Sequence, residues 1–289
     1  MERVMRLGAL NVVAQPHSQD IYHQIIKHLR RSQRAVRIRG DRFGMIASLN
    51  SLDGPASDRF VEGLIVTFTP IDVTADWVNI TSGKKAQDDE LSTIQIPKNL
   101  QPNAKFHHFR FYLKDHTLLF EVGNSGTKLT PENAGRMFER LLSAPDVEKK
   151  FGQVISTVLP NSDTIDRIIT HKRLRYIHIV LYAPNPDKGA AAEQKVKNRL
   201  EKMLARRMER IVVAKTKAHL ALDEEIVQEA KIGAKNGKVE AKVEVGKKVE
   251  KISTVETPFL YSHSYYAGEG TTEGEFGVAS GRAVSDLRG

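Results

Sequence analysis

The sequence has no cysteine and only one tryptophan in 289 residues. Without cysteine there can be no disulfide, no thiolate metal ligand and no cysteine nucleophile, and such a chain is compatible with a reducing compartment. Long apolar runs are also missing, because the longest, near residues 63–66, is far too short to span a bilayer. The first residues lack the apolar segment of a secretory signal. We therefore expect a cytoplasmic protein without a membrane segment.

Basic residues outnumber acidic ones, 44 to 35, which gives a net charge of +9. Clustered lysine and arginine side chains bind phosphates and release counterions, so a polyanionic partner is physically reasonable. A basic surface that only keeps the protein soluble is the alternative. The remaining composition, 40% hydrophobic and 27% charged, is that of a globular protein able to bury a core.

An alternating stretch near the middle of the chain predicts a β-hairpin, with one strand at 106–114 and its returning partner at 117–122. A period of two places Phe109, Phe111 and Leu113 on one face, and His108, Arg110, Tyr112 and Lys114 on the other. With the predicted strand at 175–182 alongside, an uncovered second face would be an aromatic and basic platform for single-stranded nucleic acid. A half-buried face under a helix is the alternative.

Helix-like and strand-like periods together predict an α+β protein with antiparallel or mixed sheets and packed helices. Residues 190–211 are predicted to form one helix, and residues 238–255 a solvated hairpin after an Asn-Gly turn. The glycine-rich end at 268–289 lacks periodicity, so we expect it to be disordered or to serve as an interaction tail. The predicted units are an N-terminal α+β half (1–102), a central α+β unit (103–187), a helical and β-hairpin region (188–266) and a flexible tail (267–289).

Three arginines surround a glycine turn early in the chain: Arg37 and Arg39 precede and follow one strand residue, and Arg42 comes after Gly40. Glycine lets a backbone approach an anion, and the guanidinium fork fits phosphate. The alternative is a purely structural turn, in which a glycine holds a positive φ and Asp41 pairs with a neighbouring arginine.

A further basic cluster ends the helix predicted before the strand at 175–182. Together with the arginine turn and the polar face of the central hairpin, it supplies the predicted nucleic-acid contacts. These are Arg37, Arg39, Arg42, His108, Arg110, Lys172, Arg173 and Arg175.

The ten histidines show no chelating motif. His107 and His108 are adjacent on a strand and point to opposite faces, and His23 and His28 are five apart on a helix. We therefore predict no metal site, no cofactor and no catalytic residue.

Two other functions stay open. A metal-dependent nuclease would need acids that converge from separate loops, and the candidates nearest the basic strand are Asp41, Asp53 and Asp58. A protein-interaction or sensor module would use the hairpin at 238–255 and the aromatic cluster that follows it, since tyrosine and phenylalanine are enriched in interface cores. That cluster consists of Phe259, Tyr261, Tyr265 and Tyr266.

Several stretches taken in order resemble an uncharacterised bacterial family, a domain of unknown function found in mobile and phage-defence gene neighbourhoods. The resemblance covers about residues 1–262, implies a cytosolic bacterial protein of antiviral defence, and supplies no catalytic residues. The stretches are Gly8-Ala9-Leu10-Asn11, Pro16-His17-Ser18, Ile38 to Gly44, the strand from Arg175 that ends in Ala183-Pro184-Asn185-Pro186-Asp187, Asn236-Gly237-Lys238-Val239, and Ser253-Thr254 before Pro258.

The leading hypothesis is a nucleic-acid-binding, non-enzymatic component of a bacterial antiviral defence or regulatory system. RNA and DNA are equally compatible with the sequence. A homodimer would follow if the predicted C-terminal helix pairs with a copy of itself.

Overall fold

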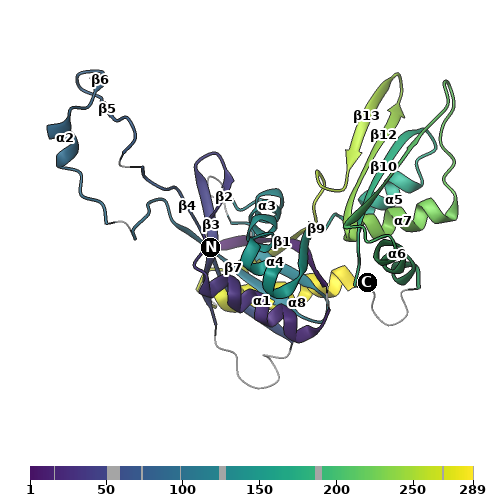
Figure 1. Cartoon of the computed structure of the whole chain (residues 1–289), viewed down its shortest axis with the longest axis horizontal. Coiled ribbons are helices and arrows are strands. Elements are labelled where there is room, and N and C mark those ends of the chain that lie inside the picture. The colour runs from purple at the N-terminus through teal and green to yellow at the C-terminus, as the bar shows by residue number, and fades with distance from the viewer. Residues whose placement is uncertain are drawn as a thin grey trace.

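The computed structural model describes residues 1–15, 17–50, 59–72, 74–97, 99–123, 128–185, 191–268 and 270–288. Helices and antiparallel strands occur together in it, which confirms the predicted α+β class. Figure 1 shows two sheets next to each other, helices packed against them, and a thin excursion leaving the larger sheet. None of the helices in the described ranges is both long and apolar enough to cross a membrane. The division into units stays a prediction.

The larger sheet has eight strands. They are β1 (Glu2–Gln15), β2 (Val36–Arg39), β3 (Arg42–Leu49), β4 (Phe60–Phe68), β7 (Lys105–Tyr112), β8 (Thr117–Glu121), β9 (Gln153–Val158) and β14 (Leu260–Tyr266). Their order is β14-β1-β8-β7-β4-β3-β2, and β9 pairs with the second half of β1. The predicted central hairpin is confirmed as β7 and β8.

One face of the larger sheet is covered by three helices: α1 (Gln19–Arg31), α3 (Pro131–Leu142) and α4 (Pro145–Phe151). Side chains at helical spacing give α1 its buried stripe: Tyr22, Ile25, Ile26 and Leu29. The Ser18 hydroxyl caps α1 by accepting a hydrogen bond from the Ile21 amide at 3.2 Å. Phe109 and Phe111 of β7 point into this core, as their period predicts.

The disorder predicted for the C-terminal end is wrong, because these residues form α8 (Thr272–Arg288) on the second face of the larger sheet. Phe276, Ala279, Ala283 and Val284 are buried against the sheet. These residues have helical spacing, but two of the four are alanines, and small residues give only a weak hydrophobic pattern in the sequence. Small side chains also allow the helix to lie close to the sheet.

The smaller sheet contains β10 (Leu174–Tyr182), β11 (Arg207–Val213), β12 (Gly237–Val245) and β13 (Lys248–Ser253), in the order β11-β10-β12-β13. Its helices are α5 (Ser162–Ile169), α6 (Ala191–Lys202) and α7 (Glu224–Lys235). The predicted hairpin at 238–255 is confirmed as β12 and β13, joined by a turn in which Gly246 has a φ of +61°.

Two predictions fail in this region. The helix predicted at 190–211 ends at Lys202, and residues 207–213 form β11, where exposed and half-buried residues alternate. The strand at 175–182 was predicted to lie beside the central hairpin, but it pairs with β11 and β12 in the smaller sheet. The apolar side of α6, Val196 and Leu200, is buried in the core of the smaller sheet. That side is therefore already used within the chain, which removes the basis for a dimer through this helix.

The connection between β4 and β7 runs from residue 69 to residue 104, and we call it the arm. It contains β5 (Val78–Asn79), β6 (Lys84–Lys85) and the single-turn α2 (Asp88–Ser92). In Figure 1 the arm extends away from both sheets.

Candidate nucleic-acid interface

The predicted contacts lie in three separate places. Arg37, Arg39 and Arg42 are in the β2–β3 hairpin, His108 and Arg110 are on β7 under α8, and the remaining residues lie at the start of β10. The last group consists of Lys172, Arg173 and Arg175. The fold therefore does not bring the predicted contacts onto one surface.

The β2–β3 turn has the geometry expected of a structural turn. Gly40 has a φ of +51°, Arg37 donates from Nε to the Gly40 carbonyl at 2.5 Å, and its Nη2 lies 3.6 Å from Asp41. Arg42 donates to the Thr67 hydroxyl at 2.6 Å. Burial lowers the pKa of the Arg42 guanidinium. The Arg39 side chain in this turn is exposed, like those of Arg37 and Asp41.

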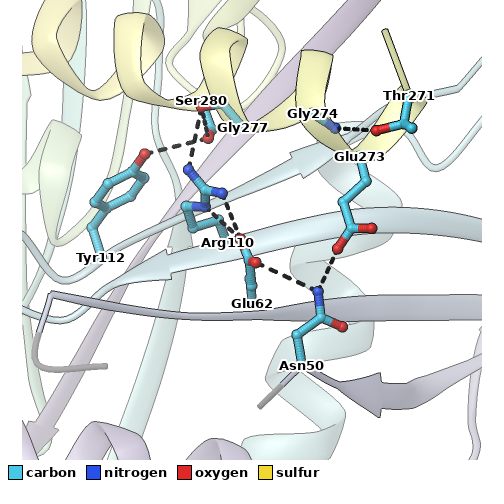
Figure 2. A network of polar contacts seen from close by, with 9 residues as sticks. All are labelled: Asn50, Glu62, Arg110, Tyr112, Thr271, Glu273, Gly274, Gly277 and Ser280. Carbon is cyan, nitrogen blue, oxygen red and sulfur yellow. Dashed lines mark hydrogen bonds and ion pairs between the residues drawn. The ribbon is translucent and has the colours of Figure 1, made fainter. Parts of the chain in front are cut away.

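Arg110 is held in a polar network beneath α8, as Figure 2 shows. Its Nε and Nη2 donate to the Glu62 carboxylate at 2.8 and 2.5 Å, and its Nη1 donates to the Gly277 carbonyl at 3.2 Å. The guanidinium carbon lies 4.1 Å from the centre of the Phe60 ring. Of the two alternatives for this sheet face, the structure shows the half-buried one under a helix.

His108 belongs to the same covered face. Its ring stacks on Phe276 of α8, with 5.5 Å between ring centres. The Tyr112 hydroxyl meets Ser280 of the same helix at 3.3 Å (Figure 2). Both side chains therefore serve to dock α8.

The smaller sheet has a face of a different kind. Ile177, Ile179 and Leu181 of β10 are fully buried against α5, α6 and α7, which lie on one side of this sheet (Figure 1). We call the opposite side the open face. Its side chains are Tyr176, His178, Val180 and Tyr182 on β10, Lys238, Glu240, Lys242 and Glu244 on β12, Arg207, Glu209, Ile211 and Val213 on β11, and Val249 and Lys251 on β13.

Each of the carboxylates Glu209, Glu240 and Glu244 on the open face contacts more than one basic side chain. Glu240 lies 2.6 Å from Lys238 Nζ and 2.9 Å from Lys251 Nζ. Burial alone would raise the pKa of Glu240, but the hydrogen bonds from these lysines outweigh it and lower the pKa. In return, Glu240 raises the pKa of Lys251. These groups are therefore all charged at neutral pH.

The predicted cluster at the start of β10 joins the open face through Glu244. Arg173 donates to this carboxylate at 2.9 Å, and Arg175 Nε lies 3.4 Å from it. Hydrogen bonds from His219 and Arg173 lower the pKa of Glu244. Lys172 is exposed beside them.

Cations outnumber carboxylates on this surface. Glu209 is also shared, by Arg207 and His178, each at 2.9 Å. Six lysine and arginine side chains thus accompany four carboxylates: Arg173, Arg175, Arg207, Lys238, Lys242 and Lys251 against Glu209, Glu240, Glu244 and Glu256, the last of which lies 3.5 Å from Lys251 Nζ. An excess of positive charge on a flat sheet attracts a polyanion.

Tyrosines lie between these charges. Lys242 Nζ is 5.3 Å from the centre of the Tyr176 ring, and Tyr182 is paired with Arg207 across the ladder. Aromatic rings beside cations are the elements with which sheet surfaces stack bases and neutralise the phosphates between them. The alternation in 238–245 points to a half-exposed strand, but only the fold shows that β12 lies beside the tyrosines of β10.

The structure gives the nuclease alternative no metal centre in the described ranges, where no group of three or more histidine, aspartate and glutamate side chains could hold an ion. Asp41 is exposed and faces Arg37. Asp53 and Asp58 lie outside the described residues.

A polar cluster that sequence reasoning missed joins the two sheets. Asn185, just after β10, donates to the hydroxyl of the buried Tyr22, which lies 3.1 Å from His17 Nδ1. Asn11 of β1 donates to the Asn236 side chain before β12 at 3.0 Å. Four of the stretches that carry the family resemblance thus meet at this joint, through Asn11, His17, Asn185 and Asn236. In the sequence, the family resemblance was the one signal that marked these stretches.

Fold and surface together define an α+β protein of two antiparallel sheets, one covered on both faces and one open on a single face. The family model described as "Domain of unknown function (DUF4747)" matches residues 3–278, and the chain belongs to this family. The match reaches into α8 and includes Glu62, Arg110 and Gly277, whereas Ser280 lies beyond it. No curated protein matches the chain.

Proposed function

We propose that the protein binds single-stranded nucleic acid on the open face of the smaller sheet and acts as a non-enzymatic component of a bacterial antiviral defence or regulatory system. The observation that carries the proposal is the presence of two tyrosines, Tyr176 and Tyr182, among surplus cations on the open face of an antiparallel sheet. Tyr176 and Tyr182 stack bases, and Lys238, Lys242 and Lys251 contact phosphates.

Of the contacts predicted from sequence, Lys172, Arg173 and Arg175 extend this surface at one end. Arg37 and Arg39 stay proposed secondary contacts on the β2–β3 hairpin. For Arg42, His108 and Arg110 the internal contacts described above supply a structural role.

Fluorescence anisotropy with labelled oligo-U and oligo-dT tests the binding surface. Lys242→Ala should weaken binding to either probe and reduce the slope of log affinity against log salt by about one unit. Tyr176→Ala should cost about 1–3 kcal/mol of binding and leave the salt slope unchanged, because it removes stacking and no charge.

The matched control is Lys149→Ala on α4, which removes an exposed lysine far from the open face in the chain and in the fold. It should leave affinity and salt slope at the wild-type values. Equal losses in Lys149→Ala and Lys242→Ala would contradict a defined surface and point to non-specific charge attraction.

The role in antiviral defence rests on the family resemblance. It is tested by phage challenge of cells that carry the wild-type gene or the Lys242→Ala variant at equal protein levels. Protection that survives Lys242→Ala would separate the biological role from nucleic-acid binding.

A protein-interaction or sensor role is the second candidate, and one observation favours it. Ile211 and Val213 on the edge strand β11 are 56% and 66% exposed, and Val249 on the opposite edge is 60% exposed. Exposed apolar side chains at sheet edges are suited to a protein partner. Ile211→Ser should then abolish capture of that partner, and, although Ile211 lies on the open face, it should weaken oligonucleotide binding less than Tyr176→Ala does, because it removes neither a charge nor an aromatic ring.

A further inference from the structure

The arm contributes nothing to either hydrophobic core. No described residue from Phe68 to Phe106 is buried, although this stretch contains a hairpin and a helical turn. At the arm's distal hairpin Ile80 is 91% exposed and Val78 is 64% exposed. Figure 1 shows this part of the chain standing clear of both sheets.

The bonds that shape the arm are all its own. Its base is closed by the Thr69 amide donating to the Pro102 carbonyl at 3.2 Å, and its hairpin by the Ala86 amide donating to the Trp77 carbonyl at 2.8 Å. In α2, Glu90 accepts a hydrogen bond from the Gln87 amide at 2.8 Å. Among the described residues, no hydrogen bond or ion pair joins the arm to either sheet.

Ordering a segment of this length costs conformational entropy at every residue, and burial of apolar surface is what normally offsets it. No described apolar side chain of the arm is buried, although several are half-buried. Long connections without a core of their own are usually either functional or disordered, and this one contains a hairpin and a helical turn. A defined hairpin with exposed apolar side chains therefore requires a surface that the single chain does not supply.

Charge identifies the kind of surface. The arm carries five acidic and three basic residues, a net charge of −2. Because the whole chain has a net charge of +9, the residues outside the arm together carry +11. Three of the acids are consecutive in the first turn of α2: Asp88, Asp89 and Glu90. Such a segment repels nucleic acid and is attracted to a basic protein surface, and the chain's own body is one.

We propose that the arm packs against the body of a second copy of this chain, and that two copies exchange arms in a symmetric dimer. In an isologous dimer both arms gain a packing surface at once, because the body of each protomer contacts the arm of its partner. The exposed Val78 and Ile80 supply the apolar contact, and the acids of α2 supply the electrostatic one.

Sedimentation velocity over a concentration series tests this directly with the full chain. The wild type should dimerise at micromolar concentration, and the dimer should weaken with added salt. The double variant Val78→Ser/Ile80→Ser should raise the dimer Kd by about tenfold or more. The control Leu204→Asn removes a 95% exposed apolar side chain outside the arm, at a positive φ that asparagine tolerates, and should leave the Kd unchanged.

Amide hydrogen exchange gives a second readout on the same samples. Residues 77–92 should exchange more slowly at high protein concentration than at low, and the double variant should lose this difference. A wild type that stays monomeric throughout the series overturns the proposal and assigns the arm to a different partner. A dimer that survives the double variant with an unprotected arm overturns it too.

Discussion

The ion pair between Arg110 and Glu62 is the sharpest test of whether a basic residue here serves the fold or a ligand. Arg110→Ala removes the bonds to the Glu62 carboxylate, the contact over Phe60 and the hydrogen bond to the Gly277 carbonyl that ties down α8. The two charged side chains are 14% and 13% exposed, so Glu62 would be left largely buried and without its partner.

Breaking a buried pair in this way costs about 3–5 kcal/mol, and the residual exposure places the expected loss near the lower end. Total stabilities are about 5–15 kcal/mol, so this is a large fraction. Urea unfolding should therefore show a clearly lower midpoint for Arg110→Ala with an unchanged slope. The double variant Arg110→Met/Glu62→Leu should recover most of the loss, because no charge is then left alone.

Arg136→Ala is the matched control. Its partner Glu132 lies 2.7 Å away on the surface of α3, with side chains 47% and 55% exposed. Losing this exposed helical pair should cost less than about 0.5 kcal/mol. If Arg110→Ala proves as mild as Arg136→Ala and instead weakens oligonucleotide binding, the structural role argued for Arg110 is refuted.

Two further predictions concern buried positions. Burial, and next to it the charge of Arg42, lowers the pKa of His107 from 6.5 to about 4, so protonation favours the unfolded chain. The free energy of unfolding holds the full contribution of neutral His107 above about pH 6.5. It falls by up to about 3 kcal/mol as the pH drops from there through about 4, at about 1.4 kcal/mol per unit of pKa difference between the folded and unfolded states. His107→Leu should flatten the loss of urea stability between about pH 7 and about pH 5, and an unchanged profile would exclude His107 as its source. A Cβ at residue 237 would lie 2.0 Å from the Val180 carbonyl oxygen, whereas one at residue 281 meets nothing within 4 Å. Gly237→Ala should therefore destabilise the protein by about 1–3 kcal/mol and Gly281→Ala, inside α8, should stabilise it by about 0.5–1 kcal/mol, so a shared sign in thermal unfolding would count against the packing described.

Local patterns predicted individual elements well where a strong period was present. The central hairpin and the hairpin after Asn236-Gly237 are both confirmed, because alternation and turn residues act within a few positions of each other. The C-terminal helix α8 was not predicted, because its buried side consists largely of alanine and has only one large aromatic residue, Phe276. The helix predicted at 190–211 was extended too far, because Arg207 to Val213 keeps apolar residues that also fit a helical stripe.

Pairing between distant strands could not be predicted from such patterns. The strand at 175–182 was assigned to the central hairpin, while in the fold it pairs with β11 and β12. The same limit applies to the site. Tyr176 and Lys242 are 66 positions apart and meet only because β10 and β12 are adjacent. Whether a helix covers a sheet face is likewise decided by the whole chain, and α8 decides between the two alternatives that the sequence left open for the polar face of β7.

Ultraviolet cross-linking of a labelled single-stranded oligonucleotide to the full-length protein, followed by mass spectrometry of the linked peptides, tests the central claim most directly. Stacked bases should cross-link to the tyrosines of the open face, so the linked peptides should contain Tyr176 or Tyr182, and Tyr176→Ala should lose its cross-link while the protein stays folded. Cross-links confined to the β2–β3 hairpin, or none above the level seen with a covalently closed duplex, would contradict binding on the open face.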